Sequence, residues 1–393
     1  MIRSLTSPTV YLFLIWCLAI QPANEAVAQD DANESNQGAA TGSTASQLPL
    51  KPEPQPQLRP LPIDPYESFV DAPPSYLGPM YPSTSCPPIR RNRYRAFLEY
   101  LYLQPGSVAR TGYAMPVDGP VLPPDTPPVP MGPTAFVDPG YSSGLRLGFG
   151  IEVDPCRPGD EWSLVYTYFR NTKSSSIGVD PQESVVIDAL VIHPSTAAAD
   201  SVFLNASGDG KLEFHLLDVD RKTNVSNCSY TLDYILGLRL ANMNQDFSSQ
   251  FVNSTTTENV STSIDYDGAG FKLGLNGELH SSRNRMRIYG RGTATFLAGR
   301  FHSAYTQTDS IRGTVVSSSR NDDSVVPVLD LEMGIGWASQ NDRLQLRLGY
   351  LFNAWYNVIS NEKFIDSVQN ARAGDVRDTL TFDGLVTRAE FRF

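Results

Sequence analysis

The sequence is short of charge, of basic residues and of long apolar segments. Only 19% of its 393 residues are charged, and 42 acidic side chains face 31 basic ones. The resulting net charge of −11, without a basic aromatic stripe, argues against a nucleic-acid-binding protein. Beyond the first residues, no stretch approaches the roughly 18 consecutive apolar residues that a membrane helix requires. Helical membrane proteins are therefore excluded as a class.

Glycine, proline and aromatic residues are plentiful instead. The chain contains 29 glycines and 30 prolines, and 10% of its residues are aromatic. This composition suits many short strands joined by loops.

The first 28 residues have the layout of a secretory signal peptide. Arg3 precedes the apolar run VYLFLIWCLAI, which is too short to span a bilayer, and Ala26-Val27-Ala28 predicts cleavage near Ala28. A buried N-terminal helix is the alternative. Residues 29–93 are rich in proline and cannot bury a core, so they predict a disordered periplasmic leader. The protein is expected to be exported.

From residue 94 onward, apolar and polar residues alternate in ten segments. Most of them have the nine to eleven residues of a tilted membrane strand. The segments are 95–103, 144–153, 160–170, 211–221, 228–240, 267–279, 284–297, 327–338, 343–356 and 380–393.

The lengths of the connections alternate as well. Short links at 154–159, 222–227, 280–283 and 339–342 separate long connections at 104–143, 171–210, 241–266, 298–326 and 357–379. Short periplasmic turns and long extracellular loops are typical of outer-membrane barrels. The sequence thus predicts an all-β fold for residues 94–393: a transmembrane, antiparallel, up-and-down β-barrel of about ten strands in the outer membrane.

Alternation alone does not say which face of the strands looks outward. The signal peptide, the loop asymmetry and the terminal phenylalanine favour lipid on the apolar side, with outer-membrane lipid as a partner. The charged face would then line a narrow lumen, as a selectivity device or as a structural polar core. The candidate lumen-lining residues are Glu99, Arg146, Glu152, Asp233, Arg239, Lys272, Glu278, Arg285, Arg287, Arg291, Asp330, Glu332, Arg343, Arg347, Arg388, Glu390 and Arg392.

The chain ends in strict alternation, VTRAEFRF. Phe391 and Phe393 share a face and form the terminal aromatic–x–aromatic pattern that the barrel-assembly machinery reads. An ordinary edge strand that ends in phenylalanine is the alternative.

Several of these segments together resemble a known family. FLEYLYLQPG, GLRLGFGIEVDPC, EWSLVYTYF, DYDGAGFKLGLNGEL, RIYGRGTATFLAGRF and FDGLVTRAEFRF are similar, in this order, to the Legionella-type pore-forming outer-membrane proteins. The resemblance covers about residues 94–393. It implies a transmembrane barrel proposed to form pores, and it supplies no catalytic residues.

The sequence therefore predicts a narrow, porin-like passive pore, and a non-conducting structural or adhesive surface barrel is the alternative. An outer-membrane hydrolase at the rim is a third interpretation, for which His193 and His302 with nearby loop aspartates are the candidates. No histidine has metal-ligand spacing with another. The sequence predicts no enzyme, no cofactor and no metal site.

A disulfide is expected between Cys156 and Cys228. Both lie beside short turns at the periplasmic rim, and the compartment is oxidising. Two free thiols are the alternative, and Cys86 would remain the odd cysteine.

Overall fold

The computed structural model of the protein describes residues 94–119, 129–153, 160–180, 184–196, 202–226, 230–281, 285–372 and 374–393. The signal peptide, the proline-rich leader and both cysteines of the expected disulfide, Cys156 and Cys228, lie outside these ranges. Those expectations stay predictions.

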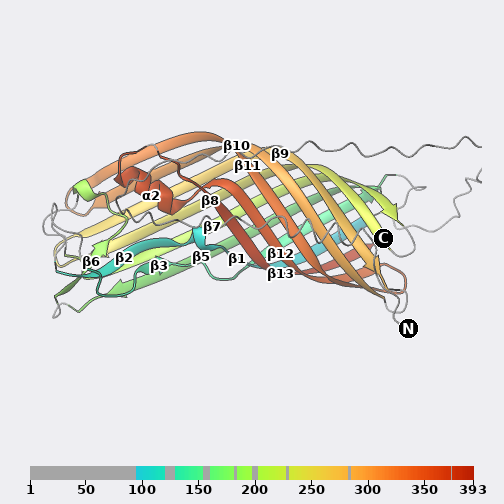
Figure 1. The fold of residues 1–393 in the computed structure, drawn as a ribbon, viewed down its shortest axis with the longest axis horizontal. Helices are drawn as coiled ribbons and strands as arrows, with labels where there is room; N and C mark the ends of the chain where they lie inside the picture. The colour runs from blue at the N-terminus through green and yellow to red at the C-terminus, as the bar shows by residue number, and fades with distance from the viewer. Residues whose placement is uncertain are drawn as a thin grey trace, which may run out of the picture. The chain divides into compact units, whose positions relative to one another are not determined.

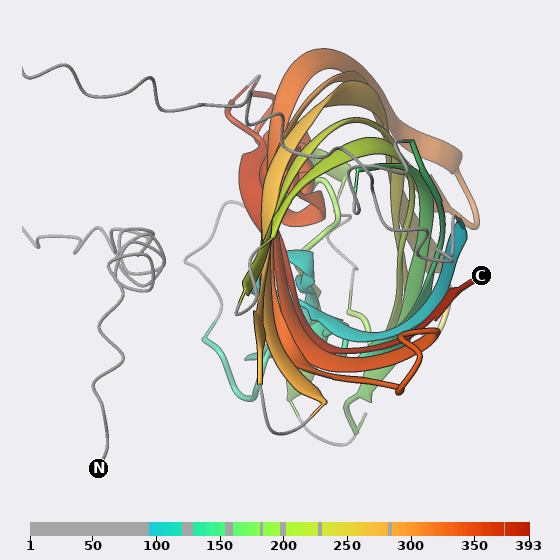
Figure 2. The same cartoon turned by 90° about the vertical axis from the view of Figure 1, so that its right-hand side faces the viewer.

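Ten antiparallel strands close into a barrel (Figures 1 and 2). Each overlaps one of the ten segments predicted from the alternation, so the predicted fold class is confirmed. In barrel order the strands are β1 (Tyr94–Pro105), β13 (Arg377–Arg392), β12 (Leu344–Ile359), β11 (Gly313–Ala338), β10 (Met286–Asp309), β9 (Thr257–His280), β8 (Tyr230–Val252), β7 (Asn205–Ser226), β5 (Glu161–Gly178) and β4 (Ser142–Glu152).

The first and last strands close the ring. β1 pairs with β13 on one side and with β4 on the other. The backbone amide of Tyr94 donates to the Phe393 carbonyl at 3.0 Å, and the amide of Phe393 donates to the Tyr94 carbonyl at 2.9 Å. We call this end of the barrel the terminal end and the opposite end the hairpin end.

Two of the predicted long loops are wrong. Residues 241–266 and 298–326 mostly continue as strands, and only 253–256 and 310–312 form the turns between them. β8, β9, β10 and β11 consequently contain 23, 24, 24 and 26 residues. About ten residues suffice to cross a bilayer, so these strands extend well beyond it.

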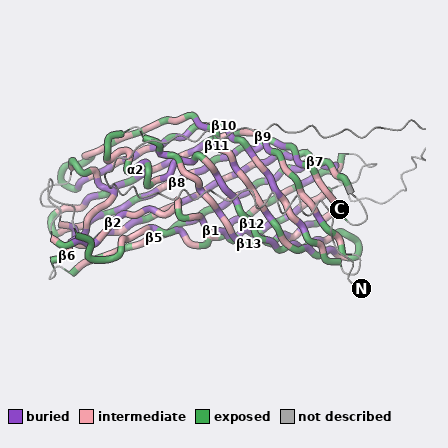
Figure 3. Tube along the Cα trace, viewed as in Figure 1, coloured by how far each residue is buried: buried purple, intermediate pink, exposed green. Residues whose placement is uncertain are grey.

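The loops were predicted there because the polarity of the two strand faces inverts along the chain. In β8, Leu236, Leu238 and Leu240 are exposed on the outer face, whereas Arg239 is buried inside. Four residues further on, Asn244 lies on the outer face and Met243 is buried inside, although the strand is unbroken. Buried and exposed residues alternate throughout (Figure 3), but their chemistry is exchanged. The terminal half is apolar outside and charged inside, and the hairpin half is the reverse.

The remaining long connections carry the other elements. β2 (Thr111–Asp118), β3 (Ala135–Val137) and β6 (Val185–Ala189) form a small sheet in the order β3-β2-β6. Two single 3-10 turns, Ser107–Ala109 and Pro194–Thr196, and the helix α2 (Asn361–Gln369) complete the set. No helix in the described part of the chain is long and apolar enough to cross a membrane.

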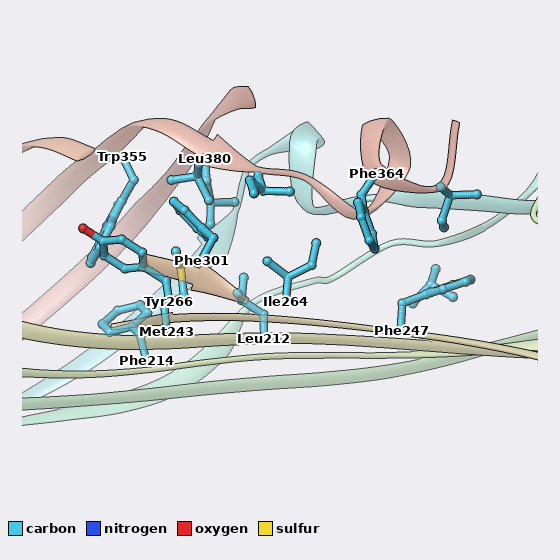
Figure 4. Packing of buried hydrophobic residues seen from close by; sticks show 14 of the residues in the cluster. Leu212, Phe214, Met243, Phe247, Ile264, Tyr266, Phe301, Trp355, Phe364 and Leu380 are labelled. Atoms are coloured by element: carbon cyan, nitrogen blue, oxygen red, sulfur yellow. The ribbon is translucent and has the colours of Figure 1, made fainter. Parts of the chain in front are cut away.

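The small sheet and α2 cover the inner faces of the long strands in the hairpin half, where β11 extends beyond its pairing with β12 and β5 beyond its pairing with β4. A Cβ atom built on Gly208, in the inner face of β7, would lie 2.8 Å from the Val137 side chain, so glycine makes room for β3. Phe364 of α2 is buried in the same cluster as the wall residues Phe301 and Tyr266, whose rings are 4.5 Å apart between centroids. Figure 4 shows this packing. We call this apolar filling the plug.

Candidate functional site: the charged lumen

The lumen of the terminal half is occupied by buried, charged side chains. Alternation along β7, β8, β9 and β11 directs their charged side chains inward. The guanidinium of Arg239 donates to both carboxylate oxygens of Asp218, at 2.7 and 2.9 Å, and to Asp330 at 2.9 Å. The ammonium of Lys272 donates to Asp218 at 2.6 Å and to Asp220 at 2.9 Å. Two cations and three carboxylates, from four strands in all, thus share one cluster.

This central cluster is sealed from water on most sides. The Lys272 and Asp220 side chains are both 0% exposed. A Cβ atom on Gly237 would lie 2.2 Å from Asp220 Oδ1, so only glycine leaves room for this carboxylate. Oδ1 has no hydrogen-bond partner among the described residues. Because buried ions are stable only when they are paired, Asp220 depends on Lys272 alone.

A second cluster joins the first and last strands. Glu99 of β1 accepts hydrogen bonds from Arg146 of β4 at 2.7 Å and from Arg388 of β13 at 2.8 and 3.0 Å. The guanidinium carbon of Arg388 also lies 4.0 Å from the ring centroid of Phe97. The seam at which the barrel closes is therefore held by charge-assisted bonds as well as by backbone pairing.

A third set of ion pairs lies nearer the terminal end. Arg95 bonds to Glu161, and also to Glu390 at 3.1 Å. Lys222 donates to Glu161 at 2.8 Å. Between β12 and β9, Arg347 donates to Glu278 at 2.5 Å.

Most of the candidate lumen residues lie on the inner face, where they form the ion pairs described above. Glu152, Asp233, Arg287, Arg291, Glu332 and Arg392 line the interior near the terminal end. Arg285 and Arg343 are exposed at the terminal rim. Each immediately precedes the first residue of its strand, β10 or β12, and its carbonyl still accepts a hydrogen bond from the neighbouring strand.

Sequence reasoning missed several inward charges. Arg95, Glu161, Asp218, Asp220 and Lys222 all take part in the ion pairs. Alternation along β7 could have shown that Asp218 and Asp220 point inward. It was obscured because the same inward face carries the apolar residues of the plug further along the strand.

A cavity remains at the terminal end, which we call the vestibule. It has a volume of about 290 Å³ and reaches the rim beside Tyr94 and Asp342. The space beyond it, between Arg146, Arg239 and Asp330, measures only about 10 Å³. That is about the room of one water molecule.

At the hairpin end, a buried polar cluster fastens the connection between β6 and β7. The hydroxyl of Tyr305 donates to the Val191 carbonyl at 2.8 Å. The amide of Gln307 donates to Thr196 at 2.9 Å and to Glu258 at 3.1 Å. Burial raises the pKa of Glu258 above its usual value. This cluster joins the connection around Val191 and Thr196 to β9 and β10.

The residues proposed for a rim hydrolase do not converge. The backbone amide of His193 donates to the inward-facing Gln307 at 3.1 Å, whereas His302 is exposed on the outer face of β10, with Nδ1 2.6 Å from Asn321. The barrel wall lies between the two imidazoles. Within the described ranges, no group of three or more histidine, cysteine or acidic side chains is arranged to hold a metal ion.

The two terminal phenylalanines lie on the lipid-facing side. Phe391 and Phe393 are 54% and 61% exposed. The ring of Phe393 stacks on Tyr94, with centroids 5.9 Å apart, and Tyr94 stacks on Phe149 at 6.1 Å. The last residue of the chain is thus placed by the first strand.

Comparison with known proteins gives one match of sequence and several of fold. A family described as Legionella pneumophila major outer membrane protein precursor matches residues 86–393. None of the curated proteins matches the chain.

Three solved structures have similar folds. The outer membrane protease OmpT of Escherichia coli has a TM-score of 0.40 and 10% identity, over 79% of this chain and 100% of its own. The toluene transporter TodX of P. putida has a TM-score of 0.33 and 11% identity, over 77% and 90%. A major outer membrane protein of Thermus thermophilus has a TM-score of 0.29 and 12% identity, over 76% and 99%.

Proposed function

The chain belongs to the family of the Legionella pneumophila major outer membrane protein, and from this premise we propose that it is an outer-membrane barrel with a structural role at the cell surface. Under this proposal, the barrel does not conduct ions in the conformation described above. The proposal assigns it no catalytic activity.

The filling of the lumen carries this proposal. Solutes that enter the vestibule meet the ion pairs around Arg239 and Lys272 and, beyond them, the apolar plug. A hydrated ion would have to separate buried charge pairs and then cross a region lined by Phe214, Phe301 and Trp355. Either step is unfavourable because the ion loses its hydration without gaining polar contacts.

The outer surface supports a membrane position with a large projecting part. The belt of leucines on β8 and its neighbours fits contact with outer-membrane lipid, and we assign it that partner. The polar outer face of the hairpin half fits water. We further propose that Phe391 and Phe393 present the assembly signal read by the barrel-assembly machinery.

Planar-bilayer recording of the refolded protein tests the proposal. Folding is first verified by the difference in gel migration between boiled and unboiled samples. We expect no discrete conductance steps at any voltage from the folded barrel. Reproducible steps from the wild-type protein would contradict the structural role.

A narrow, porin-like passive pore is the second candidate. The open space of the vestibule favours it, because a cavity of about 290 Å³ lined by polar side chains already enters the barrel from the terminal end. In this case the plug, held by α2 and the small sheet, would have to move. A disulfide engineered between the plug and the wall would then abolish the conductance steps, and its reduction would restore them.

A further inference from the structure

One basic side chain of the vestibule differs from all the others. Seven arginine and lysine residues line this cavity, and six of them form an ion pair with a carboxylate. Arg291 is the exception. Among the described residues it has no hydrogen-bond or ion-pair partner, although it points into the same space. Its five N–H donors are therefore available to a ligand.

An acidic side chain that lines the same cavity, Asp233, forms no ion pair with a described residue. Among the described residues, Asp233 accepts hydrogen bonds from the neutral amides of Asn224 and Asn276 alone, the latter at 2.7 Å. A carboxylate has about four acceptor sites, so roughly two of them remain free. No lysine, arginine or histidine that the structure describes forms an ion pair with it.

The strand register places these two residues close together. Asp233 of β8 lies directly opposite Asn276 of β9, and Asn276 lies directly opposite Arg291 of β10. Two strand spacings separate Asp233 from Arg291, which is roughly 10 Å between Cα atoms. All three line the vestibule. An unpaired cation and an acid without a cation thus face one cavity, with an amide between them.

We propose that the vestibule binds a small zwitterion of the amino-acid class, with its carboxylate on Arg291 and its ammonium group on Asp233. The guanidinium fork matches a carboxylate in a bidentate geometry. A simple anion fits less well, because it would leave the Asp233 carboxylate without a cation. Glu332 lies directly opposite Arg291 in β11, and its carboxylate accepts a hydrogen bond from the Tyr289 hydroxyl at 2.9 Å. This site does not require a conducting lumen.

Titration calorimetry with three probes of equal chain length tests the site. The probes are 4-aminobutyrate, butyrate, which carries only the carboxylate, and butylammonium, which carries only the cation. We expect 4-aminobutyrate to bind to the detergent-folded protein at least about tenfold more tightly than either single-charge probe, because a charge-assisted hydrogen bond contributes this much.

Two substitutions assign the two ends of the ligand. Arg291→Gln should weaken 4-aminobutyrate binding about tenfold or more and leave butylammonium unaffected. Asp233→Asn should weaken 4-aminobutyrate similarly and leave butyrate unaffected. Arg285→Gln is the matched control, since Arg285 is exposed at the rim outside β10, and it should change neither affinity.

Unchanged 4-aminobutyrate affinity in a folded Arg291→Gln protein would overturn the proposal. Equal affinity of the wild-type protein for all three probes, or no binding of any, would overturn it as well. The wild-type series decides the question alone if a variant does not fold.

Discussion

Replacing Lys272 with methionine should be one of the most damaging single changes in the barrel wall. Methionine has a similar length and keeps the apolar stem, so the change mainly removes the ammonium group. Asp218 would keep Arg239, at 2.7 and 2.9 Å, but Asp220 would lose its partner at 2.9 Å. Breaking a buried ion pair by removing one partner typically destabilises a protein by about 3–5 kcal/mol. We expect the free energy of unfolding of Lys272→Met to fall by about this amount.

Urea titration in detergent, followed by tryptophan fluorescence and gel migration, measures this loss. Lys211→Met on β7 is the control. Lys211 is part-exposed on the outer face beside Glu213, and such pairs are worth about 1 kcal/mol or less. The double variant Lys272→Met/Asp220→Asn should be more stable than Lys272→Met alone, because the stranded charge is gone. A loss below about 1 kcal/mol for Lys272→Met would refute the reasoning, since it would mean that water solvates the aspartates and that the cluster is not sealed.

Three further predictions address other parts of the chain. Phe301→Ala should lower the free energy of unfolding by about 3–5 kcal/mol, because Phe301 is fully buried on the inner face of β10. Phe271→Ala should lower it far less, because Phe271 is 70% exposed on the outer face. Urea titration compares the two variants, and equal losses would contradict the assignment of the faces. The raised pKa of Glu258 means that the folded state favours the protonated carboxyl group. The stability of the wild-type protein, compared with that of Glu258→Gln, should therefore be lowest at neutral pH and should rise as the pH falls through the folded pKa of Glu258. Melting curves measured for both proteins against pH check the sign. Deleting Phe393 should reduce the yield of barrel in the outer membrane, since it removes both the terminal aromatic and the contact with Tyr94; an undiminished yield in membrane fractions would show that this residue is incidental.

The sequence predicted the terminal half of the barrel well because one physical rule governs it. Lipid outside and a small lumen inside impose strict alternation, as Leu346, Arg347 and Leu348 illustrate. In the hairpin half, water replaces lipid outside and a packed core replaces the ions inside. The apolar residues therefore lie on the inner face instead of the outer face. Sequence reasoning ended each strand at the point where this pattern inverts. Met243, Phe247 and Phe251 carry the continuing signal at a spacing of four residues.

The partners within the lumen could not be predicted in the same way. Alternation says that Lys272 and Asp218 point inward, but their contact depends on the stagger between β7 and β9, strands that are not neighbours. The isolation of Arg291 is likewise a property of distances between side chains. Sequence reasoning also places strand boundaries only to within a few residues, so it could not show that Arg285 and Arg343 lie just before their strands, exposed at the rim.

The inversion of polarity has a consequence for how the barrel finds its hydrogen-bonding register. A slip of one residue between two strands turns each side chain of the slipped strand to the opposite face. In an ordinary membrane barrel, such a slip is unfavourable because of the lipid environment alone. Here a one-residue slip of β8 would place Arg239 in lipid and Leu240 in the lumen, and it would also bring Phe247 into water and Ser248 into the plug. Lipid and water would both reject the same error, at opposite ends of one strand, so long strands such as β8 to β11 are aligned by two independent environments during assembly.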